Sequence, residues 1–402
     1  MTALFRKKGA SQDTPADPPH PAEPGTAAEP GGPAGTAAPS EPLDLQLGEH
    51  HDTPVLHLTP DLMVRQQNEL AEMERELGPG HEDVLRARHT HAMMLGNWAA
   101  VAPPGDTRMA DREIALLEVN LGYQEASLGP DHLGTLRTCQ SIGHAHLTAG
   151  RPRQAIPYLE RALEGRERGA DPDDEETLTA REKLSEACAA AGMTDRAITL
   201  LEETAAASER LLPPGAETVR DRKAKLFDAY REAGRRAEAI ALCKEIIEDT
   251  ERFYGPHHLD TYTWVDNLAH LHHDEQDLDA AIACYERAIA GLEQIHGPDS
   301  EALSYRYHNL AIAHLEDGRP DRAVPHLAAA HSAREHTFGA DHGTTLDALV
   351  DLINALDRAG RPTEAVEATE RLLAALLRVG GPDHPQLPEV RAYLEQLRRL
   401  LP

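Results

Sequence analysis

Residues 255–296 read GPHHLDTYTWVDNLAHLHHDEQDLDAAIACYERAIAGLEQIH, and their pattern returns every 42 residues along the chain. A glycine marks the middle of five copies, and Gln276 takes that place in the sixth; the glycines are Gly150, Gly192, Gly234, Gly318 and Gly360. Five residues later every copy carries an alanine: Ala155, Ala197, Ala239, Ala281, Ala323 and Ala365. A fixed period of this length indicates stacked copies of one supersecondary unit, so the repeat itself predicts the fold.

Each copy contains two stripes of apolar residues with the spacing of an α-helix. In the quoted copy the first stripe is Tyr262, Val265, Leu268 and Ala269, and the second is Ala281, Ile282, Tyr285, Ala288 and Ile289. The glycine between the stripes suits the left-handed residue that ends a helix, and a proline suits the first turn of the next helix, as Gly318 and Pro320 illustrate. Each copy therefore predicts a helix, a tight turn and a second helix.

These features resemble the tetratricopeptide repeat family, in particular its 42-residue, kinesin-light-chain-like branch. The small residue at the close contact between helices matches the family pattern and is Gly143, Ser185, Ala269 or Ala311 in four copies. The aliphatic residue before it, the alanine that opens the second helix and the Gly-Pro-Asp-His loops at 129–132 and 381–384 also match. The chain departs from the pattern at Phe227, Ile353 and Gln276. The resemblance covers about residues 78–384 and implies an all-α, right-handed solenoid of stacked helix-turn-helix units.

On this interpretation the chain has four parts. They are 1–52, a Pro-, Ala- and Gly-rich tail; 53–128, an N-terminal helix and a divergent unit with an insertion; 129–384, six 42-residue units; and 385–402, a capping helix. The tail has too few apolar residues to offset its ordering entropy, so we expect it to be disordered. The N-terminal helix is expected over 61–77, and nine extra residues are expected between Trp98 and Thr107. The last helix is expected to cover the final apolar face of the solenoid.

Charge and composition narrow the class of partner. The formal net charge is −28, which argues against nucleic acid and favours a protein or peptide partner that is basic or neutral. No apolar run reaches the roughly 18 residues that a membrane span needs, and no apolar segment follows the first residues as in a secretory signal. The four cysteines form no close pair, as expected of buried free thiols in a reducing compartment: Cys139, Cys188, Cys243 and Cys284. We expect a cytoplasmic protein without membrane contact, and the preference for arginine over lysine suggests a bacterial gene.

The motifs of common catalytic sites are missing from the sequence. The chain has no Gly-Lys dipeptide and therefore no phosphate-binding loop of the Walker type. His81 and Glu82 lack the second histidine of a zinc-protease motif, and there is no Gly-x-Ser-x-Gly elbow. The sequence predicts a protein without enzymatic activity and without a cofactor.

Three sets of histidines call for different interpretations. One set shares a repeat position and is expected to pack in half-buried sites: His146, His272 and His314. The loop set is expected to make local turn contacts: His132, His258, His342 and His384. In the third, Asp266, His270 and His273 share one helix face, and His308 of the next unit is expected to approach them. Such a set can hold zinc, which leaves a metal-dependent enzyme or metal carrier as an alternative to solvated groove residues.

The resemblance implies that the first helix of each unit lines a concave surface that grips a peptide. Some members of the family hold the ligand backbone with an asparagine one residue before the core leucine, a position that Asn267 and Asn309 occupy. An amide donates and accepts, so it can pair with a peptide unit. A hydrogen bond between adjacent helices is the alternative role. The other residues expected on this surface are Lys183, Lys225, Asp228, Asp266, His270, Tyr305, His308 and Asn354.

The sequence thus predicts a non-enzymatic scaffold that binds a peptide or helix of a partner protein in the groove. A regulatory sensor, in which a small peptide or metabolite changes the curvature of the solenoid, is a further alternative. The sequence does not determine the oligomeric state.

Overall fold

The computed structural model describes residues 60–401 apart from 101–105, 170–173 and 214, and in that part of the chain it contains helices and no strands. The expected tail, 1–52, lies outside the described residues. So does most of the expected insertion, which falls between the end of α2 at Ala100 and the start of α3 at Arg108.

The helices follow one another as pairs. The first helices of the pairs are α2 (Glu82–Ala100), α4 (Leu133–Thr148), α6 (Glu175–Ala190), α8 (Glu217–Glu232), α10 (Leu259–Asp274), α12 (Glu301–Glu316) and α14 (Gly343–Arg358). The second helices are α3 (Arg108–Leu128), α5 (Pro152–Gly169), α7 (Thr194–Leu211), α9 (Arg236–Tyr254), α11 (Leu278–His296), α13 (Pro320–Phe338) and α15 (Pro362–Gly380). Before them lies α1 (Pro60–Leu77), and after them a short 3-10 helix (Gly381–Asp383) and α16 (Leu387–Arg398).

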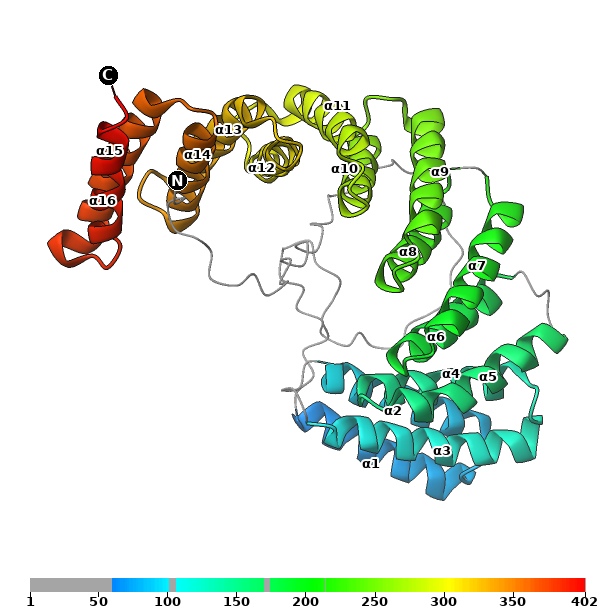
Figure 1. Ribbon diagram of the computed structural model, residues 1–402. Coiled ribbons are helices and arrows are strands. Elements are labelled where there is room, and N and C mark those ends of the chain that lie inside the picture. Colours follow the sequence, from blue (N-terminus) through cyan, green and yellow to red (C-terminus); the bar gives the residue numbers. More distant parts are fainter. Residues whose placement is uncertain (1–59, 101–105, 170–173, 214, 402) are drawn as a thin grey trace, which may run out of the picture.

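The pairs stack into an all-helical solenoid that follows an arc. Figure 1 shows α8, α10 and α12 on the inner side of the arc and α9, α11 and α13 on the outer side. Each helix contacts the one before it and the one after it, and the inner helix α4 also contacts α2 and α6 directly. The predicted fold class is therefore confirmed.

The repeat alanines lie in the core. All six, from Ala155 to Ala365, are at most 2% exposed where the two helices of a unit pack together. Gly143 serves the same contact from the first helix: a Cβ atom on it would lie 2.5 Å from Cγ of the fully buried Leu159. The small residues that define the sequence pattern are thus required by the close approach of the helices.

The turn within each unit depends on one residue with a positive φ. The repeat glycines adopt φ values of 68–79°, and Gln276 adopts the same backbone conformation with φ 61°. In this region a side chain costs about 1 kcal/mol or more, which explains why glycine occupies the position in the other copies.

The loop histidines cap the helices that follow them. The side chains of His132, His258 and His342 each accept a hydrogen bond from the backbone N–H two residues on, at the start of α4, α10 and α14. His384 Nδ1 accepts one from the N–H of Gln386 in the same way, at 3.3 Å. The predicted local turn contacts are confirmed, and their role is to satisfy donors that a helix start leaves open.

The repeat-position histidines pack as expected. His146 and His314 are buried, and the ring of His146 stacks on Tyr158 with centroids 5.7 Å apart. His272 is half-buried. All four cysteines are free; Cys139, Cys188 and Cys243 are buried and Cys284 is half-buried.

At each end of the described chain an additional helix packs on the adjacent unit. At the C-terminal end α16 packs on α15, and Leu387, Val390 and Leu394 join the same apolar cluster as Leu372 and Leu376. At the other end α1 packs on α2. No helix within the described ranges is long and apolar enough to cross a membrane.

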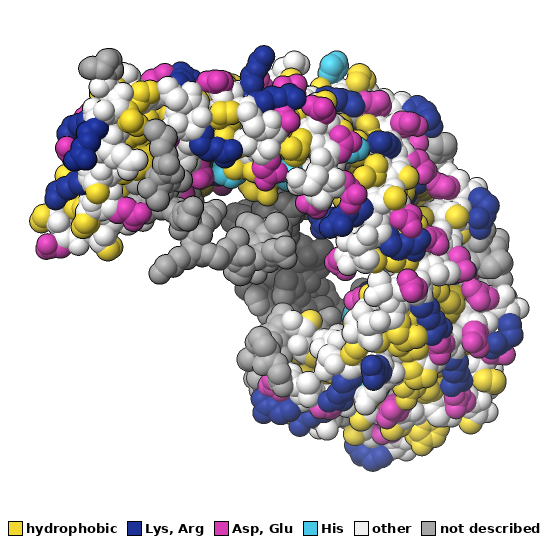
Figure 2. Space-filling view, in the orientation of Figure 1, with side chains coloured by type: hydrophobic (Ala, Val, Ile, Leu, Met, Phe, Trp, Pro, Cys, Tyr) yellow, Lys and Arg dark blue, Asp and Glu magenta, His cyan; other side chains and the backbone are white. Residues whose placement is uncertain are grey.

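Charged side chains link neighbouring units across the surface. Figure 2 shows basic and acidic side chains interspersed over the visible face. Several ion pairs join residues about one repeat apart, such as Arg151 with Asp111 at 2.6 Å and Arg319 with Asp279 at 3.2 Å. Each exposed pair contributes little to stability, so the stacking of the units depends mainly on the apolar core.

Candidate ligand-binding groove

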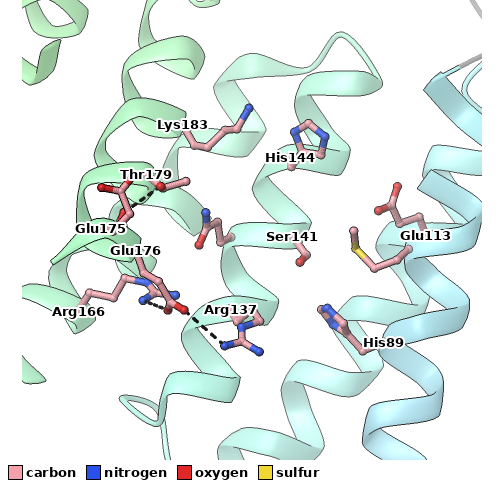
Figure 3. Close-up of a pocket in the computed structure, with 12 residues that line it drawn as sticks. His89, Glu113, Arg137, Ser141, His144, Arg166, Glu175, Glu176, Thr179 and Lys183 are labelled. Atoms are coloured by element: carbon pink, nitrogen blue, oxygen red, sulfur yellow. Dashed lines mark hydrogen bonds and ion pairs between the residues drawn. The ribbon is translucent and has the colours of Figure 1, made fainter. Parts of the chain in front are cut away.

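The inner side of the arc is hollowed near its N-terminal end. There a cavity of about 520 Å³ lies between α2, α4 and α6, with single residues contributed by α3 and α5. Figure 3 shows Glu113 on one side of this cavity, Ser141 and His144 of α4 in the middle, and Lys183 of α6 on the other side. We call this space the N-terminal pocket. Its volume lies in the range of small-molecule or side-chain binding sites.

Most charged groups around the N-terminal pocket are paired within the protein. The almost fully buried Arg166 contacts Glu176 at 2.6 Å, and Arg137 approaches the same carboxylate at 3.8 Å. Lys183 contacts Glu186 at 2.9 Å. Glu175, also on the wall, contacts Arg222 at 2.6 Å.

Two imidazoles of the pocket are held neutral. Desolvation, and secondarily the charge of Arg137, lowers the pKa of His89 below its ordinary value. Desolvation and Lys183 have the same effect on the pKa of His144. Because the ordinary value is about 6.5, both rings are uncharged at neutral pH and can donate or accept hydrogen bonds.

Glu113 differs from the other charged residues of the pocket. It is 3% exposed, and its side chain has no hydrogen bond and no ion pair among the described residues. Burial raises the pKa of its carboxyl group from 4.5 to about 7. Space for the carboxylate exists because α2 carries Gly96 opposite it: a Cβ atom there would lie 2.6 Å from Oε1 and 2.8 Å from Oε2.

Glu113 was missed by the sequence reasoning, although the sequence contains a signal for it. It stands 42 residues before Ala155 and thus at the position that holds alanine in the six regular units. The insertion between α2 and α3 places the two helices of this unit in different registers, so counting from Gly78 does not reveal the match. Counting backward from the alanines does.

The two asparagines lie on the inner helices α10 and α12. Asn267 is half-buried, and its side chain makes no hydrogen bond within the described part of the chain. Asn309 is also half-buried, and its Nδ2 is buried without a hydrogen-bond partner there. The alternative role, a hydrogen bond between adjacent helices, is therefore absent for both amides among the described residues.

The other predicted groove residues divide among separate contacts. Lys183 borders the N-terminal pocket, and Lys225 pairs with Glu182 of α6. Asp228 contacts Arg231 at 3.4 Å on α8. Asn354 is half-buried on α14.

The structure does not bring Asp266, His270, His273 and His308 together as one metal site. His270 Nδ1 lies 3.0 Å from the Tyr285 hydroxyl, and Asp266 pairs with Arg306 at 3.1 Å. His273 contacts Glu316 at 2.8 Å, and His308 lies 3.5 Å from Asp351. Among the described residues, no three of these four side chains have the spacing of a metal-ligand group, and the approach of His308 to the others stays a prediction. Tyr305 belongs to this region, with its ring 6.1 Å from that of His270.

One carboxylate cluster among the described residues does have metal-ligand spacing, but it encloses a lysine. Glu209, Glu245 and Asp249 have oxygen atoms within 4.8 Å of one another. The buried Lys223 ammonium contacts all three, at 2.5, 2.6 and 2.8 Å. Its charge occupies the position that a cation would take, and the three carboxylates raise its pKa above the ordinary value although burial opposes them.

The fold of this chain, a solenoid of helical pairs with a hollowed inner side, is that of a helical repeat protein. The tetratricopeptide repeat family matches residues 114–168, 226–293, 261–336 and 307–378, which together make up just over half of the chain. The chain belongs to the tetratricopeptide repeat family. Such folds commonly mediate protein–protein interaction, and they are typically non-enzymatic.

Solved structures with the same kind of fold have low sequence identity to the chain. One described as Podosopora anserina putative kinesin light chain nearly identical TPR-like repeats is 19% identical with a TM-score of 0.46, over 54% of this chain and 98% of that one. BtubC (BKLC) from P. vanneervenii is 20% identical with a TM-score of 0.42, over 58% and 91%. Aspartyl phosphate phosphatase F from Bacillus subtilis is 12% identical with a TM-score of 0.42, over 87% and 96%. No curated protein matches the sequence.

Proposed function

We propose that the protein is a cytoplasmic, non-enzymatic scaffold whose inner groove binds an extended or helical segment of a partner protein. The observation that supports this most is that the side chains of Asn267 and Asn309 lack hydrogen-bond partners among the described residues. Both amides stand at one repeat position on inner helices. The Nδ2 donor of Asn309 is buried without a partner within the described part of the chain, which costs about 1–3 kcal/mol, so a ligand that satisfies this donor gains affinity.

The chemistry of the side chain suits a peptide backbone. An amide presents one acceptor and two donors, which can pair with the N–H and C=O of one peptide unit. Two such amides, one in each of two successive units, fix a segment at two points along the groove. The exposed ring of Tyr305, 41% exposed on α12, adds an apolar contact close by.

The net charge of −28 bears on the choice of partner. A basic or neutral segment associates faster with this protein than an acidic one, and its association slows as salt is added. A nucleic acid carries negative charge as well and would be repelled.

The test is the double variant Asn267→Ala with Asn309→Ala. A partner retained from lysate by the wild-type protein is expected to be lost with the double variant, while the melting temperature changes little because neither amide bonds to the rest of the described fold. Asn68→Ala, at an exposed position on α1, is the matched control and should retain the partner. Retention by the double variant, or a large fall in its melting temperature, would contradict the proposal.

A further inference from the structure

The unit that contains Glu113 differs from the regular units at two facing positions. A large residue replaces a small one on the second helix, and a small residue replaces a large one on the first helix. The six regular units place alanine at this site, and in the first of them Leu147 packs against the cluster that contains Ala155. In the earlier unit the second helix carries Glu113 and the first helix carries Gly96 against its carboxylate. The paired exchange replaces apolar atoms with an acceptor of hydrogen bonds that borders the N-terminal pocket.

Among the described residues, no cation pairs with the Glu113 carboxylate. Burying an ionised group without a counter-charge is costly, and protein interiors normally pair such groups. The cations around the pocket are engaged elsewhere: Arg166 with Glu176 and Lys183 with Glu186. No neighbouring charge contributes to the raised pKa of Glu113, whose cause is desolvation alone. Glu113 is therefore the acidic group of the pocket that lacks a counter-charge among the described residues.

The rest of the pocket suits a flexible apolar stem that ends in a cation. Met93 of α2 is 41% exposed and lines the cavity, so it can cover a chain of methylene groups. Gln140 and Ser141 of α4 border the same space and can contact a peptide backbone. An anionic ligand would meet the Glu113 carboxylate and is disfavoured.

We propose that the N-terminal pocket binds the ammonium group of a lysine side chain from the partner segment, with Glu113 as its counter-ion. The inference rests on the proposed function, because it needs a segment that enters the groove. Both carboxylate oxygens lie against Gly96, which leaves less room for the side-on approach of a planar guanidinium than for a compact ammonium. The proposal thus commits to lysine.

The test measures the affinity of the full chain for short synthetic peptides by NMR titration at pH 8. The probe is an acetylated, amidated pentapeptide with lysine between two pairs of alanines, and the comparison peptides carry norleucine or arginine instead. Wild-type protein is expected to bind the lysine peptide at least tenfold more tightly than the norleucine peptide and at least threefold more tightly than the arginine peptide. Equal affinity for lysine and norleucine would overturn the proposal.

Three variants locate the ammonium. Glu113→Gln should reduce the preference for lysine over norleucine to less than twofold. Gly96→Ala should weaken lysine binding at least fivefold without changing any charge, because its Cβ atom would displace the carboxylate. Glu118→Gln is the matched control: it changes the same charge on the same helix at an exposed position and should leave the preference intact. Unchanged preference in Glu113→Gln would overturn the proposal.

Two further outcomes separate the inference from the proposed function. Free n-butylamine should bind at least tenfold more weakly than the lysine peptide; equal affinity would show that the pocket takes a small amine and would overturn its assignment to a partner segment. Loss of partner with the asparagine variants, together with no lysine preference at Glu113, would refute this inference and leave the proposed function standing. The converse result would refute the asparagine contacts and leave the lysine site standing.

Discussion

Replacing Glu113 with glutamine should stabilise the protein at pH 8 and leave its stability unchanged near pH 4.5. In the folded protein burial raises the pKa of the carboxyl group from 4.5 to about 7. Between these values the folded state holds a proton that the unfolded state has released. The stability associated with the neutral acid is thus fully present below pH 4.5 and is lost as the pH rises through about 7.

The size of the effect follows from the size of the shift. Each pKa unit corresponds to about 1.4 kcal/mol, so a shift from 4.5 to about 7 corresponds to about 3 kcal/mol at pH 8. Glutamine has nearly the same shape and no charge, so the variant avoids this cost. The charged groups that line the pocket from other helices are Arg137, Arg166, Lys183, Glu175 and Glu176, and the two glutamates are paired with Arg222 and Arg166. His89 and His144 stay neutral above about pH 6.5 because their pKa values are lowered.

Hydrogen exchange of the amides in α2 and α3 is the appropriate measurement, because units of a solenoid can open locally. Protection of these amides should be greater in Glu113→Gln than in the wild type at pH 8, by up to about 3 kcal/mol in opening free energy, and equal near pH 4.5. Glu118→Gln supplies the control for the change in net charge. A difference of the same size at both pH values, or lower protection in the glutamine variant at pH 8, would refute the reasoning.

Four other consequences can be measured. Leu159→Ala removes a fully buried side chain next to Gly143 and should lower the free energy of unfolding by about 2–5 kcal/mol in urea titration, whereas a loss below 1 kcal/mol would contradict the packing described. Gln276→Gly should raise the melting temperature, since it relieves a positive φ that costs about 1 kcal/mol; no rise would count against strain at that turn. Lys223→Met leaves three carboxylates facing one another and should cost about 1–3 kcal/mol, part of which millimolar Ca²⁺ should restore; unchanged stability would argue against the enclosed ammonium. Affinity for the lysine peptide should fall about tenfold per pH unit well below the Glu113 pKa of about 7, and a flat profile from pH 5 to pH 8 would argue against an ionised carboxylate as counter-ion.

The sequence predicted the architecture because the residues that force it are small and strictly periodic. Glycine or Gln276 at the turn, alanine at the helix crossing and histidine at the helix start each have one local structural role, visible without knowledge of the tertiary fold. The same reasoning placed Asn267 and Asn309 on inner helices. Their role as ligand contacts stays a prediction.

Side-chain pairing across helices could not be predicted in the same way. Spacing along α10 correctly placed Asp266 and His270 near each other, with 4.0 Å between oxygen and nitrogen. It gave no indication that Arg306 would take the carboxylate or that Asp351 would take His308, since both partners come from other positions in neighbouring helices. The N-terminal pocket was not predicted for a related reason: it is lined by residues from five helices, and the insertion displaces one of these helices in register.

The central claim is that a partner segment lies in the inner groove, and site-specific photo-crosslinking tests it most directly. A photoreactive residue in place of Tyr305 samples the inner layer, because that ring approaches His270 of the preceding inner helix. The same residue in place of Arg287 samples the outer layer, where Arg287 pairs with Glu251 of α9. The account predicts a crosslink to the captured partner from position 305 and none from position 287. A crosslink from 287 alone would contradict it.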